Sequence, residues 1–478
     1  MTPKVVIVGA GFGGIAAAVA LTRAGFDDVV LLERADRLGG VWRDNTYPGC
    51  ACDVPAPLYS YSFALNPRWS RRFPPHGEIL DYLRRTADEH DITPRVRLNA
   101  EVTGATWTGA RWQIRLASGA ELTADVLIPS VGQLSRPAMP ALPGAERFVG
   151  PAVHTARWDP DLPIDGRRIG VIGTGASAVQ LVPEIAGRAA QVTVFQRSAP
   201  WTLPKPDRRY GVGRRFAYRR IPALMKLPRA GVWAMTVVTG RAMLGGRLAG
   251  GLLRGVSRLQ RRWQVRDPAL RARVTPDEPM GCKRVLFTSA WLPALTRSDV
   301  DLVTEKIVEV TTGGIRTADG VHHPCDTLIY ATGFAASEFL APMTVHGRDG
   351  VRLEDVWREG AYAHLGLAVP GFPNLFLMYG PNTNTGNTSA LYFLEAQARY
   401  LTQAVRRVAA SGTPLEVRPE VAADFDFEMR RRLAGSVWTG CQSWYRTAAG
   451  RVVTNWPGMA AEYHRRVARL RPDDYTQS

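Results

Sequence analysis

Two short apolar runs that each end in glycine mark the beginnings of two similar units. Residues 4–9 read KVVIVG, and a glycine loop, an alanine-rich stretch and a second apolar run, DVVLLER, follow up to residue 34. Residues 168–197 repeat this order, from RIGVIG to QVTVFQR. A β-branched run, a helix-length stretch and a second run predict a βαβ unit of about 30 residues. We therefore expect two nucleotide-binding units in one chain.

Two further segments, at 125–137 and 326–334, each combine an acidic residue, an apolar run and a glycine turn. We interpret both as strands that return the chain from one domain to the other. The predicted fold class is α/β, with two Rossmann-like dinucleotide-binding domains, the first discontinuous and the second inserted into it. The predicted limits are 1–140 and 335–478 for the two parts of the first domain, 141–160 for a linker, and 161–334 for the second domain, whose helical insertion spans 205–280.

The first glycine loop has the pattern of a dinucleotide-binding site. Gly9, Gly11 and Gly14 fill GxGxxG directly between a strand and a helix. The first glycine permits a tight turn, the second lets the backbone approach a pyrophosphate, and the third lets the helix pack closely on the strand. Glu33 ends the next strand, where its carboxylate can bind both ribose hydroxyls.

The second glycine loop is followed by a basic residue in place of an acidic one. Its fixed places are Gly173, Gly175 and Ala178, and alanine is an accepted variant in the third place. Arg197 and Ser198 stand where an acid would end the next strand. An acid would repel a 2′-phosphate, whereas arginine pairs with it, so this unit is predicted to prefer NADPH over NADH. The alternative is that Arg197 is a solvated surface charge.

Two nucleotide domains in one chain suggest hydride transfer from NADPH to a flavin. A disulfide reductase would carry a redox-active cysteine pair, commonly CxxxxC, in its first domain, and the sequence has none there. We therefore expect the electrons to pass to dioxygen.

The chain has five cysteines, an odd number. Cys50 and Cys52 are too close together for a zinc-binding CxxC hook, and the sequence has no second pair, so we expect no metal site. The first strand begins at Lys4, which leaves no room for a signal peptide. These observations predict a reduced, cytoplasmic protein.

The net charge is +17, and nearly all of the basic residues are arginine. A GC-rich genome would explain this content, and attraction to polyanions is the functional alternative. The sequence has no nucleic-acid-binding motif or basic tail, so we do not expect nucleic acid as a partner. The basic segment 205–280 has no uncharged run near the about 20 residues of a spanning helix. It is expected to pack over the second domain as a helical insertion, or to make weak contact with an anionic membrane.

Three segments carry a resemblance to a known family. Residues 39–53, GGVWRDNTYPGCACD, fill the pattern GG-x-W-x4-Y-P-G-x3-D, and residues 281–295 contain a Lys-Arg pair. Residues 148–159 fill F-x-G-x-x-x-H-x-x-x-W-P/D at Phe148, Gly150, His154, Trp158 and Asp159. Over essentially its whole length, the chain resembles the type I Baeyer–Villiger monooxygenases, which are class B flavoprotein monooxygenases that use FAD and NADPH.

The resemblance implies a reaction as well as a fold. NADPH would reduce FAD, O2 would form a C4a-peroxyflavin, and this species would attack a small-molecule ketone to give an ester or a lactone. The negative oxygens on this route require a permanently charged donor in a site that excludes water. The resemblance assigns this role to Arg284, with Asp53 holding it through a paired hydrogen bond and Lys283 near the NADPH 2′-phosphate.

Motifs and resemblance together give the residues of two cofactor sites. The FAD site is expected to contain Gly9, Gly11, Gly13, Gly14, Glu33, Gly40, Val41, Trp42, Asp53, Tyr59 and Val102. The NADPH site is expected to contain Ala51, Cys52, Gly173, Thr174, Gly175, Ala176, Ser177, Ala178, Arg197, Ser198, Lys283, Arg284 and Trp456. For Trp456, packing in the core is the alternative.

Other parts of the family pattern concern the loops between the domains. His154 is expected to hydrogen-bond across the domain junction, and Trp158 to anchor the linker in an apolar pocket. Residues 380–389 would close over the flavin ring, and Asn387 stands there where related chains often carry histidine.

Three alternative functions stay open from the sequence. A flavin monooxygenase that oxygenates sulfur or nitrogen shares the glycine loops. A non-oxygenating NADPH–flavin reductase would feed a partner, and a catalytically inactive flavoprotein would act as a binding scaffold. The intact loops, Arg197 and the Asp53–Arg284 pair argue against the last.

Overall fold

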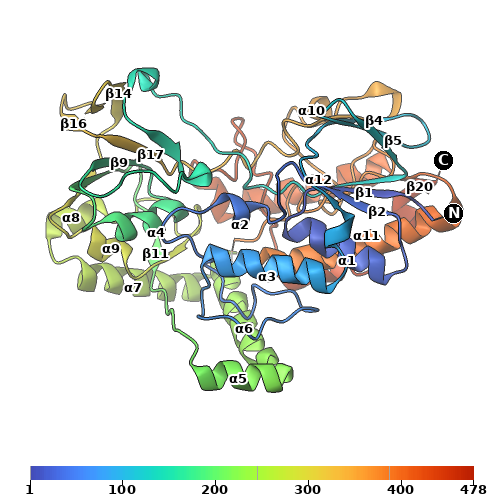
Figure 1. The fold of residues 1–478 in the computed structure, drawn as a ribbon, viewed down its shortest axis with the longest axis horizontal. Helices are drawn as coiled ribbons and strands as arrows, with labels where there is room; N and C mark the ends of the chain where they lie inside the picture. The colour runs from blue at the N-terminus through green and yellow to red at the C-terminus, as the bar shows by residue number, and fades with distance from the viewer. Residues whose placement is uncertain (1, 245, 387, 478) are drawn as a thin grey trace.

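Two parallel β-sheets lie side by side and divide the molecule into two lobes (Figure 1). The computed structural model describes residues 2–244, 246–386 and 388–477. In each lobe, helices cover one face of the parallel sheet and a smaller sheet covers the other (Figure 1). The predicted α/β class with two Rossmann-like units is therefore confirmed.

The first lobe is built on a parallel sheet whose side chains alternate between two cores. Its strands, in spatial order, are β3 (Val96–Arg97), β2 (Val29–Leu32), β1 (Val5–Val8) and β7 (Val126–Pro129). One face carries α1 (Phe12–Arg23) and α11 (Ala390–Ser411), and the other carries the sheet of β18 (Thr344–His346), β4 (Val102–Trp107), β5 (Trp112–Leu116) and β6 (Glu121–Ala124). Val5 and Ile7 pack toward the helices, whereas Val6 and Val8 pack toward the smaller sheet. Burial on both faces explains why this strand is apolar throughout.

The second lobe repeats this plan. Its parallel sheet has the order β13 (Val300–Val303), β10 (Gln191–Phe195), β9 (Arg168–Ile172), β17 (Thr327–Tyr330) and β8 (Ala152–His154). One face carries α4 (Ala176–Ile185) and α9 (Trp291–Ala294), and the other carries β14 (Ile307–Thr311), β15 (Gly314–Thr317) and β16 (His322–Pro324). Each glycine loop leaves the carboxyl end of a central strand, so both loops open toward the space between the lobes.

The two expected return strands are β7 and β17, and the chain segments that follow them meet. Pro137 bridges Phe334, and the Ala138 N–H donates to the Gly333 carbonyl oxygen over 2.9 Å. The Thr332 hydroxyl donates to the carbonyl oxygen of Ala138 over 2.6 Å. The lobes are therefore joined here by two crossings that hydrogen-bond to each other. The division into a discontinuous and an inserted domain stays a prediction.

The segment around His154 is more than the linker that the sequence suggested. Its residues 152–154 form β8, an edge strand that pairs with β17. A side chain on Gly150 would collide with the carbonyl oxygen of Asp326, so the strand can enter the sheet only with glycine at this place. The imidazole Nδ1 of His154 accepts from the N–H of Ala156, and burial lowers the pKa of this histidine.

The remaining elements complete the two lobes. In the second lobe β11 (Thr202–Leu203) pairs with β12 (Leu286–Phe287), and the insertion lies between these two strands in the chain. The insertion contains α5 (Val212–Arg220), α6 (Lys226–Met243), α7 (Arg247–Gln264) and α8 (Pro268–Arg273). In the first lobe the others are α2 (Val41–Asp44), α3 (His76–Glu89), α10 (Leu353–Val356), α12 (Pro419–Ala434), α13 (Ala460–Arg466), β19 (Leu415–Val417) and β20 (Tyr475–Gln477).

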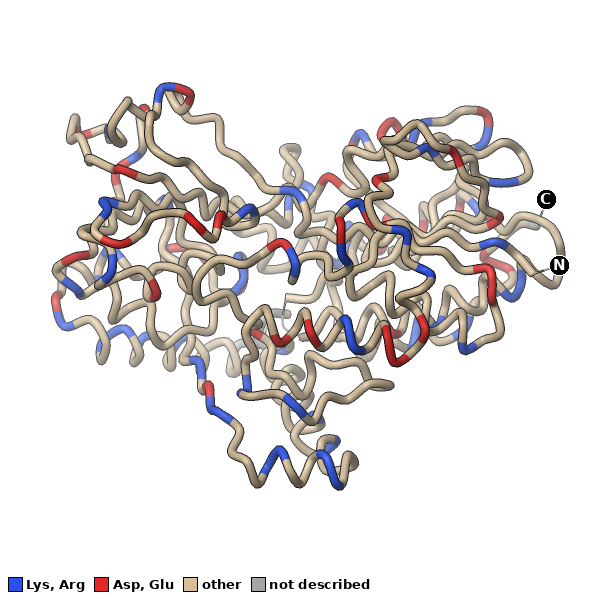
Figure 2. The backbone as a smooth tube through the Cα atoms, viewed as in Figure 1, with Lys and Arg blue, Asp and Glu red and all other residues tan. Residues whose placement is uncertain are grey.

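The insertion lies along the underside of the molecule, where α5 projects furthest (Figure 1). Lys and Arg dominate its trace, while basic and acidic residues alternate over most of the rest (Figure 2). None of the described helices is long and apolar enough to cross a membrane.

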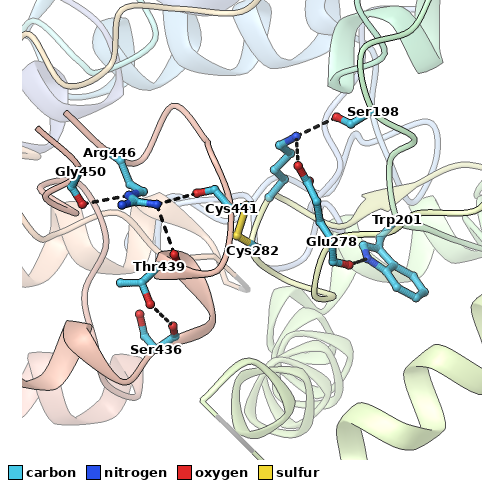
Figure 3. The surroundings of a disulfide bond; sticks show 10 residues. Ser198, Trp201, Glu278, Cys282, Ser436, Thr439, Cys441, Arg446 and Gly450 are labelled. Carbon is cyan, nitrogen blue, oxygen red and sulfur yellow. Dashed lines mark hydrogen bonds and ion pairs between the residues drawn. A yellow bond between two sulfur atoms is a disulfide. The ribbon is translucent and has the colours of Figure 1, made fainter. Parts of the chain in front are cut away.

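A disulfide joins Cys282 to Cys441, so the expectation of a fully reduced chain is wrong for these two cysteines (Figure 3). The other three, Cys50, Cys52 and Cys325, are free and buried. The number of cysteines could not predict that these two are bonded, because they lie 159 positions apart and come together only in the folded chain.

We predict that the Cys282–Cys441 bond is present in protein purified without reductant. Peptide mapping of the alkylated, non-reduced protein should yield one joined peptide pair. Cys441→Ser should remove this pair and lower the urea midpoint, because chain entropy gives a cross-link over a loop of this length at most about 5 kcal/mol. Cys325→Ala is the matched control and should leave the joined pair in place. Alkylation of all five cysteines in the unfolded, non-reduced wild type would contradict the prediction.

Candidate active site

A cleft of about 1240 Å³ runs between the lobes and is lined by both glycine loops. It exceeds the roughly 300–1,000 Å³ of an ordinary small-molecule pocket. Most of the residues that the sequence analysis selected line this one cleft: Gly9, Gly11, Gly13, Glu33, Gly40, Val41, Trp42, Ala51, Cys52, Asp53, Tyr59, Val102, Gly173, Thr174, Gly175, Ala176, Ser177, Arg197, Ser198, Lys283 and Arg284.

The first glycine loop presents bare backbone to the cleft. Gly9 has φ +105°, and a Cβ there would lie 2.6 Å from the carbonyl oxygen of Ser130. A Cβ on Gly14 would collide with the Gly9 carbonyl oxygen, which is the close packing of helix on strand expected for the third glycine. Gly11 caps α1 without a side-chain hydrogen bond, so within the described part of the chain the first N–H groups of the helix have no cap and could bind a phosphate.

Glu33 lies in the cleft wall and already holds two parts of the site together. Its Oε2 accepts from the Ala10 N–H over 2.9 Å, which ties the carboxylate to the glycine loop. Its Oε1 accepts from Nη1 of Arg43 over 2.8 Å, and both side chains are almost fully buried. Sequence reasoning missed Arg43, although it lies within the quoted segment 39–53 next to Trp42.

An aromatic pair, Trp42 and Tyr59, lines the first-lobe wall of the cleft. The indole N–H of Trp42 donates to the Tyr59 hydroxyl over 2.8 Å, and the two rings meet edge to face. Phe12, in the first turn of α1, packs against Tyr59. Gly40 has φ +54° and lies directly against Gly11, so the segment that carries Trp42 is positioned by the glycine loop.

The second glycine loop repeats the first in the other lobe. Gly173 has φ +109°, and a Cβ there would lie 2.6 Å from the Ala331 carbonyl oxygen. Gly175 faces open space and caps α4 without a side-chain hydrogen bond. The Thr174 hydroxyl donates to the Ser198 carbonyl oxygen over 2.9 Å, which links the loop to the strand end that replaces the acid. The space beside Gly175 and the uncapped helix fit a second pyrophosphate.

Basic side chains gather at the end of β10. Arg197 is exposed there, and Lys283 Nζ donates to the Ser198 hydroxyl over 2.7 Å. Lys283 also pairs with Glu278 over 2.7 Å. Glu278 was not foreseen, because it lies outside the motif. At this place its carboxylate would compete with an anion for Lys283.

Asp53 and Arg284 meet in the cleft, one from each lobe. Arg284 Nη2 donates to Asp53 Oδ1 over 2.8 Å, a single hydrogen bond rather than the expected pair. The charge of Asp53 raises the pKa of Arg284 above its already high value, although burial acts in the opposite direction. Tyr379 and Tyr445 also lie near the guanidinium, and burial raises the pKa of Tyr445 to about 12, so this phenol stays protonated at neutral pH.

The disulfide joins two segments that line the cleft. Cys282 precedes Lys283 and Arg284 in the chain, and Cys441 precedes the cleft-lining residues 442–444. The loop of Cys441 is itself held by Arg446, which donates to the carbonyl oxygens of Thr439, Cys441 and Gly450 (Figure 3). The covalent bond therefore anchors the loop of Arg284 to the opposite lobe.

The free cysteines near the cleft are not poised for thiol chemistry. Burial raises the pKa of Cys50 to about 12 and raises that of Cys52 as well, so both are neutral thiols at working pH. Among the described residues, no group of three or more His, Cys, Asp or Glu side chains could hold a metal ion.

Several predicted residues do not reach the cleft. Ala178 is fully buried against the second core, and Phe148 and Trp158 pack at the rims of the second-lobe cores. Asp159 accepts the N–H of Asp161 at the surface. Trp456 is 2% exposed, packs edge to face on Tyr463 and donates to the Met459 carbonyl oxygen, so the structure favours core packing.

Sequence reasoning missed residues that act across the lobes. Gln180, on α4, accepts from the Tyr47 hydroxyl and donates to the Ala51 carbonyl oxygen, over 2.9 Å in each case. The available signal was a polar residue between apolar neighbours in the helix that follows the second glycine loop. In the loop 380–389, Asn384, Thr385 and Thr388 line the cleft, while Asn387 lies outside the described residues.

Known proteins share this architecture over the full chain. A family model described as pyridine nucleotide-disulphide oxidoreductase matches residues 6–219. The chain is 40% identical over 478 residues to a Baeyer-Villiger monooxygenase of Streptomyces coelicolor, covering 99% of this chain and 92% of the relative. A solved steroid monooxygenase bound to NADP matches with a TM-score of 0.85 and 31% identity, covering 98% of this chain and 97% of the other. The OTEMO complex with FAD and NADP matches with a TM-score of 0.88 and 26% identity over 100% of both chains.

The match to the Streptomyces protein exceeds what a shared nucleotide fold requires, because it extends through both lobes and the insertion. Both glycine loops and the Asp53–Arg284 pair line a single cleft. The chain belongs to the Baeyer–Villiger monooxygenase family of NADPH-dependent flavoprotein monooxygenases.

Proposed function

We propose that the protein uses FAD, NADPH and O2 to insert one oxygen atom beside the carbonyl of a small-molecule ketone, giving an ester or a lactone. The observation that carries this proposal is the Asp53–Arg284 pair, which lies in the cleft between two uncapped glycine-loop helices. When bound and reduced by NADPH, FAD would supply the electrons that activate O2.

The first lobe fits FAD. The N–H groups at the start of α1 would hold its pyrophosphate, and Glu33 would take the ribose. Trp42 and Tyr59 form the aromatic wall that would pack around the flavin, and Val102 would present backbone to the adenine. The Arg43–Glu33 pair would keep the ribose-binding carboxylate in position before the cofactor binds.

The second lobe fits NADPH. The start of α4 would bind the pyrophosphate, while Arg197, Ser198 and Lys283 would surround the 2′-phosphate. A phosphate at this place would draw Lys283 away from Glu278 because it carries more charge and offers more acceptors. Ala51 and Cys52 would lie near the nicotinamide ribose across the cleft.

Arg284 supplies the fixed positive charge that oxygen insertion needs. Within the described residues, the bond to Asp53 is the only hydrogen bond of its side chain, so most of its N–H groups are free to bind a developing anionic oxygen. Its raised pKa keeps it charged throughout the working pH range. Asp53 fixes the direction of the guanidinium, and the neutral phenols of Tyr379 and Tyr445 add no competing charge.

Matched ketone and thioether panels under ¹⁸O2 test the proposed reaction. We expect one labelled oxygen in an ester or lactone for each NADPH consumed. Labelled oxygen only in sulfoxides would identify a heteroatom monooxygenase. NADPH consumption with no label in any product would identify a flavin reductase, and either outcome would overturn the proposal.

Arg284→Ala is expected to separate flavin reduction from oxygen insertion. Anaerobic bleaching of the flavin by NADPH should persist, whereas product formation in air should fall by roughly 100- to 1,000-fold, as for loss of one oxyanion donor. Arg284→Lys should recover part of the loss because it restores charge without the planar fork. Arg297→Ala, which removes a surface ion pair with Asp299 in the same lobe, is the control and should change neither rate. Undiminished product formation in Arg284→Ala would remove this residue from the chemistry.

Arg197→Ala is expected to weaken NADPH binding without affecting NADH. The loss of one charge-assisted contact, about 1.5–3 kcal/mol, corresponds to a roughly 10- to 150-fold higher KM for NADPH. Glu278→Gln should act in the opposite direction, because it frees Lys283 for the 2′-phosphate. Steady-state KM values for both nucleotides measure the effect, and an unchanged NADPH-to-NADH ratio in Arg197→Ala would refute the phosphate role.

A further inference from the structure

The positive charge of this protein is concentrated in one segment. Residues 208–266 contain fifteen Arg and Lys residues and not one Asp or Glu. Because the whole chain has a net charge of +17, the other residues are almost balanced. Arginine codon usage would spread the charge along the chain, so it does not explain this distribution. The charge belongs to α5, α6 and α7 on the underside of the molecule (Figure 2).

Helix α7 is packed with its polar side inward. Its buried residues include Ser257, Gln260 and Arg261. In a surface helix of a globular protein, such polar residues normally face solvent. Gln260 donates to the Thr288 carbonyl oxygen over 2.7 Å, and Arg261 donates to the Ser257 hydroxyl over 2.7 Å while lying over the Trp201 ring. These contacts hold the polar side of α7 against the second lobe. The opposite side of the helix therefore faces solvent.

The outward side of α7 carries an apolar stripe. Leu252, Leu259 and Trp263 are 65%, 69% and 80% exposed, and Leu248, one turn earlier, is also exposed. Their spacing of four and seven residues places them on one flank of the helix. Apolar side chains this exposed and contiguous mark a binding surface rather than ordinary surface scatter.

A row of arginines runs beside the apolar stripe. Arg254, Arg258 and Arg262 are exposed and four residues apart, so they form a second flank of α7 that also faces outward. Helix α5 repeats the combination, with Val212 and Phe216 exposed among its arginines. The outer surface of α5 and α7 therefore combines apolar anchors, an exposed tryptophan and dense positive charge.

We propose that this face, α5 to α7, docks the protein reversibly on the surface of an anionic phospholipid bilayer. The leucines and Trp263 would enter the boundary between headgroups and acyl chains, and the arginines would pair with lipid phosphates. Docking would be peripheral, since no described helix is long and apolar enough to span the bilayer.

Charge complementarity selects the bilayer over other occupants. A second copy of the chain seated on α7 would bring two arginine rows together without an acid to pair them. Nucleic acid would pair with the arginines but would leave the leucine stripe in water. An anionic bilayer matches both flanks of the helix at once.

The docking face is firmly attached to the lobe that carries the aromatic wall. Arg229, on α6, donates to the carbonyl oxygens of Pro57 and Ser60 over 2.9 and 2.8 Å, next to Tyr59. Trp233, one turn further, packs on Tyr392 at the start of α11. Because α7 rests on the second lobe and α6 on the first, docking would orient the whole enzyme on the membrane.

Vesicle flotation of the full-length, FAD-loaded protein tests this proposal. We expect it to float with phosphatidylcholine vesicles that contain phosphatidylglycerol, to stay behind with phosphatidylcholine alone, and to be released by high salt. Arg254→Gln/Arg258→Gln/Arg262→Gln should lower the partition coefficient by roughly a hundredfold, at about fivefold for each arginine. Leu252→Ser/Leu259→Ser should also reduce binding, although it leaves the charge unchanged.

Matched variants separate docking from general effects. Arg406→Gln/Arg431→Gln/Arg469→Gln removes three exposed arginines from the first lobe, and Val308→Ser/Phe427→Ser removes two exposed apolar side chains elsewhere. These controls should bind vesicles like the wild type, and all variants should keep their FAD content and NADPH oxidation rate. Equal binding to neutral vesicles, no binding to anionic ones, or equal losses in the controls would overturn the proposal. A wild-type dimer in sizing chromatography that the leucine variant dissociates would assign the face to a second copy.

Discussion

The contact between Asp53 and Arg284 sets the conditions that the rest of the structure must meet. Its two residues are 231 positions apart and belong to different lobes, so neither lobe can form the site alone. The Asp53 segment is fixed by Gln180, which reaches across from α4 to Ala51. The Arg284 loop is fixed by the Cys282–Cys441 bond to the opposite lobe. The pair is therefore held from both sides. Gln180 ties the segment of Asp53 to the second lobe, and the disulfide ties the loop of Arg284 to the first.

Both sheets must turn their carboxyl ends toward the same cleft for this contact to exist. The crossings at residues 136–138 and 332–335 satisfy that requirement. They follow the carboxyl ends of β7 and β17, one in each sheet, and hydrogen-bond to each other. Edge strand β8 adds the segment of His154 to the second sheet immediately after the crossing. The place of Gly150 follows from this arrangement, since a larger residue there would push β8 away from β17.

The sequence predicted those features whose causes are local. A strand, a glycine turn and a helix occupy about 30 consecutive residues, and φ values of +105° at Gly9 and +109° at Gly173 are a direct reason for the glycines. Apart from the Asp53–Arg284 pair, which the family resemblance implied, side chains that meet only in the folded chain escaped prediction. Glu278 beside Lys283 is one case, and the disulfide is another, because a count of cysteines carries no information on their pairing. For Trp456, the sequence could not tell which way the C-terminal segment faces, and its side chain lies in the core.

Arginine serves three physical purposes in this chain, and only the neighbours of each residue distinguish them. Arg43 is buried against Glu33, where a charge without its partner would be costly, so it rigidifies the wall of the first site. Arg284 keeps one carboxylate partner and leaves the rest of its fork open to the cleft, which is the condition for stabilising a charge that appears only during a reaction. Arg254, Arg258 and Arg262, the exposed row of α7, have no acid in residues 208–266 to pair with, so their charge faces solvent. Composition gives the same residue type in all three places, whereas the partners of each guanidinium differ. Arg43 pairs with two carboxylates, Arg284 with one, and the exposed arginines of α7 with none in their own segment.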